Sequence, residues 1–108
     1  MAYDEGLAIR LEEQLSEWPI RTRKMFGGLC FLFNGNMCCG IVGDCLMARV
    51  GPDQYADCLQ QPHAREMTFT GKAMKGMVYV DPEGINEDED LMRWVQICIR
   101  FAQTLPAK

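Results

Sequence analysis

The amino-acid sequence predicts a two-layer α+β fold, in which an antiparallel five-stranded sheet carries helices on one face. Near both ends of the chain, apolar residues recur every three or four positions, as they do in amphipathic helices. Between these segments, short apolar runs alternate with turn-forming residues, as in strands joined by hairpins. Runs of strands interrupted by a helix favour an antiparallel sheet, and the expected order is α-β-β-β-α-β-β-α.

A first amphipathic helix is expected from Asp4 to about Glu17, and Pro19 ends it. Its apolar stripe repeats at spacings of four, four and three residues and consists of Leu7, Leu11, Leu15 and Trp18. Acidic residues lie between these positions, which indicates a helix with one buried face and one solvated face.

Three strands are expected next. Residues 24–33 form a nearly continuous apolar run that ends at Asn34-Gly35-Asn36, a strong hairpin signal. Residues 37–42 then return antiparallel, and a second tight turn at Gly43-Asp44 leads into residues 45–50. Gly27 and Gly28 interrupt the first of these runs and are typical of a bulge or a close backbone approach.

The second half of the chain repeats the pattern with one short helix, two strands and a longer helix. The short helix begins at Pro52 and runs through Leu59, because Pro62 prevents its continuation. Strands are expected at 66–70 and 76–80, with residues 71–75 as a loop or a wide turn. The last helix is expected to be capped at Asn86, and its apolar stripe is Leu91, Val95, Cys98, Ala102 and Leu105.

Length and composition indicate one cytoplasmic domain that spans residues 1–108. A hydrophobic content of 48% is enough for a core at this length, and the sequence contains no low-complexity tract. The acidic N-terminus lacks the positive charge of a signal peptide, and no apolar run approaches the roughly 18 residues of a membrane span. We therefore expect no membrane association.

The six cysteines are expected to be reduced thiols that act as small hydrophobes, with no disulfide framework. A catalytic thiol needs a nearby base, and the chain has one imidazole, that of His63. Zinc sites want four ligands, whereas adjacent Cys38 and Cys39 are expected to point to opposite faces of their strand. We expect no enzymatic activity, no metal and no cofactor. If Asn34-Gly35 is a two-residue turn, Cys30 faces Cys39 across the hairpin, and the two thiols could form an oxidation-sensitive pair.

The expected first hairpin is apolar on both faces, which three helices on one side of the sheet cannot cover. Either loops and helix ends cover the second face, or it meets a partner or a second copy of the chain. The second alternative predicts an interaction surface and a homodimer. The residues assigned to this surface are Met25, Phe26, Phe31, Phe33 and Met37.

A net charge of −4 disfavours direct binding to nucleic acid, which requires many Lys and Arg contacts with phosphates. Positive charge collects in two places that could contact an anion or, weakly, a nucleic acid. These residues are Arg21, Arg23 and Lys24 before the first strand, and Lys72 and Lys75 in the second half.

Several motifs together make the sequence resemble the N-terminal domain of the TfoX/Sxy competence-regulator family. They are Lys24-Met25-Phe26-Gly27-Gly28, Asn34-Gly35-Asn36-Met37, Leu46-Met47-Ala48-Arg49-Val50-Gly51, Phe69-Thr70-Gly71-Lys72-Ala73-Met74-Lys75-Gly76, Tyr79-Val80 and Leu91 to Val95. The resemblance implies a bacterial cytosolic domain with a secretion-chaperone-like fold, without catalytic residues. In longer members it implies a role in transcription of competence genes together with another DNA-binding regulator. For this chain of 108 residues we expect a stand-alone domain without their second, C-terminal domain.

These observations lead to one main hypothesis, a non-enzymatic regulatory or protein-interaction domain that acts through a protein partner, with a link to transcriptional or competence regulation. Two alternatives stay open. The chain could bind a small ligand or use its strand thiols in redox chemistry, or it could be an accessory nucleic-acid binder through its basic residues.

Overall fold

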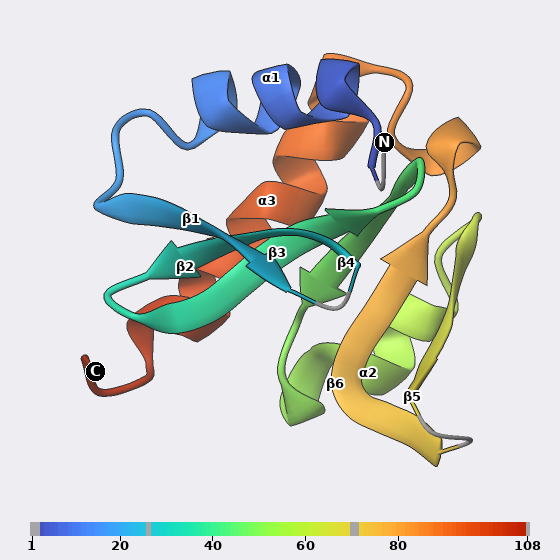
Figure 1. The fold of residues 1–108 in the computed structure, drawn as a ribbon. Coiled ribbons are helices and arrows are strands. Elements are labelled where there is room, and N and C mark those ends of the chain that lie inside the picture. The colour runs from blue at the N-terminus through green and yellow to red at the C-terminus, as the bar shows by residue number, and fades with distance from the viewer. Residues whose placement is uncertain (1–2, 26, 70–71, 108) are drawn as a thin grey trace.

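The structure, a computed structural model, describes residues 3–25, 27–69 and 72–107, without the side chains of residues 25, 68, 69 and 72–75. It confirms the α+β class, with an antiparallel sheet and three α-helices in these ranges (Figure 1). The elements in chain order are α1 (Glu5–Gln14), β1 (Ile20–Met25), β2 (Gly28–Phe33), β3 (Asn36–Val42), β4 (Cys45–Arg49), α2 (Pro52–Leu59), β5 (Ala64–Phe69), β6 (Lys72–Val80), a short 3-10 helix (Pro82–Gly84) and α3 (Asp88–Gln103).

Within the described ranges the sheet has six strands, so the prediction of five was wrong by one. Residues 24–33 are not one strand, because the chain reverses at Gly27, which has a φ of +74°. β1 and β2 pair antiparallel on either side of this turn, with Met25 opposite Gly28 and Ile20 opposite Phe33. β1 is consequently an edge strand in the order β1-β2-β3-β4-β6-β5.

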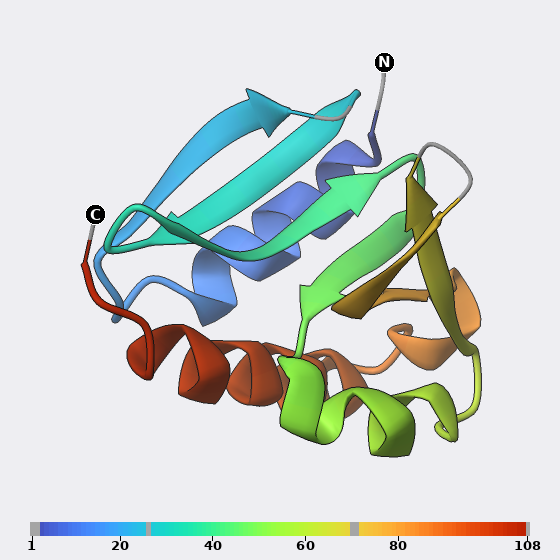
Figure 2. The ribbon, with the colours of Figure 1, turned by 90° about the horizontal axis from the view of Figure 1, so that it is seen from below.

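The helices cover one face of the sheet, as predicted. Leu7, Leu11 and Leu15 from the first helical segment and Trp94 and Ile99 from α3 enter a single apolar cluster, which we call the main core. β2, β3, β4 and β6 contribute their inward side chains to the same cluster, and α2 adds Cys58. Figure 2 shows α2 and α3 along the same side of the sheet.

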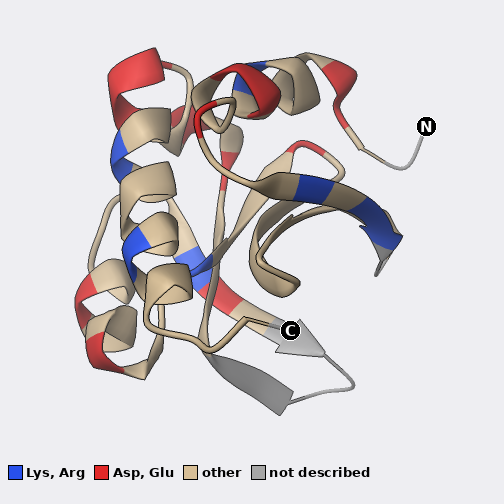
Figure 3. Cartoon of the chain, turned by 90° about the vertical axis from the view of Figure 1, so that its left-hand side faces the viewer, with Lys and Arg blue, Asp and Glu red and all other residues tan. Residues whose placement is uncertain are grey.

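The opposite face of the sheet is also apolar, and the sheet itself encloses part of it. Cys30, Met47, Met67 and Met77 form a separate buried cluster on this face, here called the second cluster. Leu32, Met37, Val42 and Tyr79 pack around it and are partly buried. The sheet curls strongly (Figure 3). Side chains of this face from β2 to β6 therefore pack against one another inside the curve.

The helix and strand boundaries differ from the prediction at several points. Asp4 caps α1, where its Oδ1 atom accepts hydrogen bonds from the backbone N–H groups of Gly6 (2.9 Å) and Leu7 (3.3 Å). α1 ends at Gln14, short of the expected Glu17, and α3 begins at Asp88 without a side-chain cap. The predicted loop 71–75 is largely strand, since β6 begins at Lys72.

Candidate functional site

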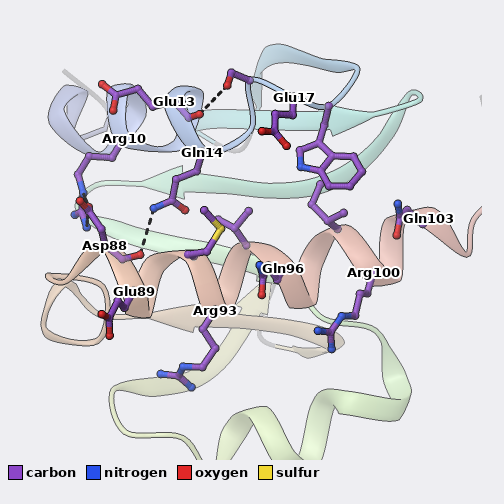
Figure 4. A pocket seen from close by; sticks show the side chains of 15 residues that line it. Arg10, Glu13, Gln14, Glu17, Asp88, Glu89, Arg93, Gln96, Arg100 and Gln103 are labelled. Atoms are coloured by element: carbon purple, nitrogen blue, oxygen red, sulfur yellow. Dashed lines mark hydrogen bonds and ion pairs between the residues drawn. The ribbon is translucent and has the colours of Figure 1, made fainter.

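An open groove of about 1200 Å³ lies between α1 and α3 (Figure 4). The leucine stripe of α1 and the apolar stripe of α3 both face the main core, and this brings the two helices alongside each other. Side chains beside these two stripes, together with the turn after α1, line the groove. They are Arg10, Glu13, Gln14, Ser16, Glu17, Trp18, Asp88, Glu89, Met92, Arg93, Val95, Gln96, Ile99, Arg100 and Gln103.

The apolar part of the groove has a buried floor and two exposed side chains above it. Val95 and Ile99 form the floor and are 2% and 4% exposed. Trp18 and Met92 are each 36% exposed, and with Ile9 they are the large apolar side chains that the structure leaves exposed in the described ranges. The Trp18 ring is held against Phe33, with ring centroids 6.0 Å apart, so its position is fixed from the sheet side.

One end of the groove is closed by Arg10. Its guanidinium donates to Asp88 Oδ1 from Nη2 (3.2 Å) and Nε (3.3 Å), and Nη2 also donates to the Ile85 carbonyl oxygen at 2.7 Å. These bonds tie α1 to the start of α3. Gln14 adds a further link, because its Nε2 donates to the Asp88 carbonyl oxygen at 3.3 Å, while its buried Oε1 has no hydrogen-bond donor in the described residues.

The charges along the groove differ between its two walls. Glu13 and Glu17 are exposed on the α1 side, and neither carboxylate has an ion pair within the described ranges. On the α3 side, Arg93 is engaged with Asp90 at 3.5 Å and donates to Gln61 Oε1 at 2.8 Å.

The described residues of the interaction surface expected from the sequence lie on different faces of the sheet in the structure. Phe31 and Phe33 are buried in the main core, at 0% and 6% exposed, and they therefore offer no free surface in the folded chain. Met37 is partly buried against the second cluster, on the other face of the sheet. The side chain of Met25 and the whole of Phe26 lie outside the described residues.

The two predicted groups of basic residues lie on different strands that are not neighbours in the sheet. Arg21, Arg23 and Lys24 are all exposed on the edge strand β1, visible as a blue band in Figure 3. Lys72 and Lys75 belong to β6, which three other strands separate from β1, and their side chains lie outside the described residues.

Two expectations about the cysteines were wrong, for one shared reason. A β-bulge between Phe31 and Leu32 shifts the register, so that Cys39 pairs with Phe31 while Cys30 pairs with Gly40. Cys30 and Cys39 thus do not face each other across the hairpin. The same irregularity brings both Cys38 and Cys39 into the main core instead of placing them on opposite faces.

All six thiols are free, and five of them are buried, as expected. A hydrogen bond with Cys38 and burial hold the pKa of the Cys39 thiol well above its ordinary value. Burial does the same to the pKa of Cys98. No group of His, Cys, Asp and Glu side chains suited to a metal ion occurs among the residues that the structure describes.

Cys45 is the one half-buried thiol, and it lies in a polar cluster. Its Sγ donates to Asp81 Oδ1 at 3.5 Å and accepts from Arg65 Nη2 at 3.4 Å, while Arg65 Nε bonds Asp81 Oδ1 at 3.0 Å. Burial and the Asp81 hydrogen bond raise the pKa of Cys45, partly opposed by Arg65. This thiol is therefore held in its protonated, weakly nucleophilic form.

Sequence reasoning missed the groove because it placed Trp18 on the buried helical stripe. The helix ends at Gln14, and Trp18 in the following turn is partly exposed and lines the groove together with residues of α3. An available signal was Met92, which is apolar but lies off the buried stripe of the last helix.

Comparison with known proteins gives a family but no individual relative. A model of the TfoX N-terminal domain matches residues 13–102, which is most of the 108-residue chain. No curated protein and no solved structure matches the sequence. None of the helices in ranges 3–25, 27–69 and 72–107 has both the length and the apolar character of a membrane span. Because this match covers well over half of the chain, the chain belongs to the TfoX N-terminal domain family.

Proposed function

We propose that this TfoX N-terminal domain is a non-enzymatic interaction module, and that its groove between α1 and α3 binds a segment of a protein partner. The domain is linked to competence regulation, and the proposed role is to contribute to such regulation through that partner. The observation that carries the proposal is the exposure of Trp18 and Met92 at the same groove. Large exposed apolar side chains that share one hollow are typical of interaction sites, and Trp is among the residues enriched at the energetic centres of protein interfaces.

The size and openness of the groove support a polypeptide occupant over a small molecule. Pockets for small ligands typically enclose about 300–1000 Å³ and surround most of the ligand. This groove has about 1200 Å³ and runs along the flank of α3 from Asp88 to Gln103. At 1.5 Å per residue, that flank is roughly 24 Å long, which suits three to four turns of a partner helix.

The chemistry of the lining supports binding over catalysis. The groove contains neither a cysteine nor the histidine, so a thiol nucleophile with an imidazole base is not assembled there. Ser16 lines the groove, but its hydroxyl donates to the Glu13 carbonyl oxygen at 2.9 Å. The remaining polar side chains are charged or amide groups of the kind that surround an apolar contact in an interface rim.

Site-specific photocrosslinking in the native cell tests the proposal. A photoreactive amino acid replaces Gln96, an exposed residue in the groove, or Asp57, an exposed residue of α2 that serves as the matched control. We expect protein adducts at position 96 that are absent at position 57, and mass spectrometry identifies them. Adducts of equal abundance at both positions, or none at position 96, would contradict the proposal.

A further inference from the structure

The inference below rests on the proposed function and concerns the kind of segment that the groove accepts. One wall of the groove is α3, and the other is α1 with the turn that follows it; no strand among the described residues lines the groove, so it presents no free strand edge. A strand lying here would find no backbone partners for its N–H and C=O groups, whereas a helix satisfies these groups internally. The geometry of the walls therefore favours a helical occupant.

The positions of the apolar side chains in the groove predict where the partner helix carries its own apolar residues. Met92 and Ile99 are seven residues apart on α3, which is about 10 Å along the axis. Trp18 lines the same groove as Met92 and Ile99. A partner helix with apolar residues on one face over two turns would contact both exposed side chains at once.

The charged side chains of the groove predict which residues flank the apolar stripe of the partner helix. Arg10 is paired with Asp88, and Arg93 with Asp90, so these residues are close to neutral as pairs. Three further carboxylates line the groove, those of Glu13, Glu17 and Glu89, against one further guanidinium, that of Arg100; none of the four has an ion pair in the described ranges. Since two of these carboxylates stand along the α1 wall (Figure 4), that wall is acidic.

We infer that the groove binds a basic amphipathic helix of the partner, whose apolar stripe covers Met92 and Trp18 and whose Lys or Arg flank faces Glu13 and Glu17. A basic flank is favourable against the acidic α1 wall and an acidic flank is not, because like charges facing each other across an interface are unfavourable; this selects one orientation of the helix over the reverse one. A second copy of the chain is disfavoured as the occupant, because it would bring another net negative rim to the same place.

A library of helix-forming peptides tests the inference directly. All members share one apolar stripe, and each flanking position is either Lys or Glu. We expect selection on the immobilised chain to enrich peptides with Lys on one flank. The enriched peptide should bind roughly tenfold more tightly than its Glu counterpart, because two partly exposed charge pairs are attractive in one complex and repulsive in the other.

Two charge-reversal variants make the test specific to the groove. Glu13→Lys/Glu17→Lys should reverse the preference from Lys to Glu peptides. Glu66→Lys/Glu83→Lys changes the net charge equally at exposed sites outside the groove and should keep the original preference. Circular dichroism confirms that both variants are folded.

Other outcomes overturn the inference in distinguishable ways. Enrichment without a charge preference, or a preference that Glu13→Lys/Glu17→Lys leaves unchanged, rejects the basic helix; adducts at position 96 would then still support a protein partner. A dimer in sedimentation that Met92→Arg dissociates would assign the groove to a second copy. Failure of both the library and the crosslinking rejects the proposed function itself.

Discussion

Gly28 lies directly against the backbone of Ile41, so closely that a Cβ atom on Gly28 would clash with the Ile41 carbonyl oxygen. The predicted close backbone approach at the glycine pair is thereby confirmed for Gly28. Gly27, by contrast, has open space around it and a φ of +74°. The two adjacent glycines thus have different roles, one in the turn between β1 and β2 and the other in the contact between β2 and β3.

This difference predicts unequal costs of substitution. Gly28→Ala should lower the free energy of unfolding by about 1–3 kcal/mol, because the backbone of β3 cannot yield as a flexible side chain can. Gly27→Asn is the matched control and should cost less than about 1 kcal/mol, since Asn tolerates a positive φ. Urea denaturation measures both values. Equal costs at the two positions would contradict the assigned roles.

The polar cluster around Cys45 predicts the thiol reactivity of the native protein. With five thiols buried, an alkylating reagent at pH 8 should modify one residue, Cys45, before the others. Asp81→Asn removes the carboxylate that raises the pKa of Cys45 and leaves Arg65 nearby, so alkylation should become several-fold faster.

Mass spectrometry of the time course identifies the modified residue. Asp53→Asn in α2, an exposed change outside the Cys45 cluster, should leave the rate unaltered. Slower alkylation of Asp81→Asn, or early modification of a core thiol such as Cys39, would argue against the described cluster.

The buried thiols predict a loss of stability at alkaline pH. The pKa values of Cys39 and Cys98 are well above the ordinary range in the folded chain, so the folded chain keeps protons that the unfolded chain releases. Their contribution is complete below the unfolded thiol pKa of about 8.5 and decreases as pH rises above it. Each such thiol should lower the free energy of unfolding by about 1.4 kcal/mol per pH unit in this range.

Urea denaturation in reductant at several values from pH 7 to pH 10 measures this slope. The variant Cys39→Ala/Cys98→Ala is less stable overall, because it leaves small cavities, but its stability should decline less steeply. Identical slopes for the two proteins would show that other groups control the alkaline behaviour.

The basic residues of β1 predict resistance to strand-to-strand association. β1 is an edge strand, and charged side chains on edges hinder pairing between molecules. Arg21→Thr/Arg23→Thr/Lys24→Thr should therefore self-associate at concentrations where the native chain does not, as measured by light scattering. Replacement of the same residues by Glu should not, because charge of either sign protects the edge.

The alternative function, an accessory nucleic-acid binder, predicts different results for the same β1 variants. If these residues contact phosphates, the native chain binds an oligonucleotide in low salt and both variants lose that binding, with no change in self-association.

The sequence predicts the regular elements well where periodicity is strong and poorly where it is absent. α2 follows from Pro52 and Pro62, and the buried stripe of α3 follows from its spacing. β1 escaped prediction because its exposed Arg-Thr-Arg-Lys segment has no apolar alternation and its pairing depends on the turn at Gly27. No residue type marks the bulge beside Leu32, which alone decides that Cys30 pairs with Gly40.

The groove was harder to predict than the fold, because it depends on the positions of two distant helices. The contacts that align these helices join residues more than seventy positions apart, such as Arg10 with Ile85 and with Asp88. Periodicity also continued to Trp18 beyond the actual end of α1, which suggested burial where the structure has an exposed ring. Local patterns define which residues a helix buries, but not which neighbour stands beside its other face.

The central claim, that the groove between α1 and α3 is the interaction surface, is tested most directly by the fluorescence of Trp18. Trp18 is 36% exposed and Trp94 is 1% exposed, so acrylamide should quench Trp18 selectively in the free chain. Addition of the partner recovered by crosslinking at position 96 should protect Trp18 from quenching and shift its emission to shorter wavelength, while a Trp18→Phe variant shows no change. Trp18 that stays fully quenchable at saturating partner would contradict the claim.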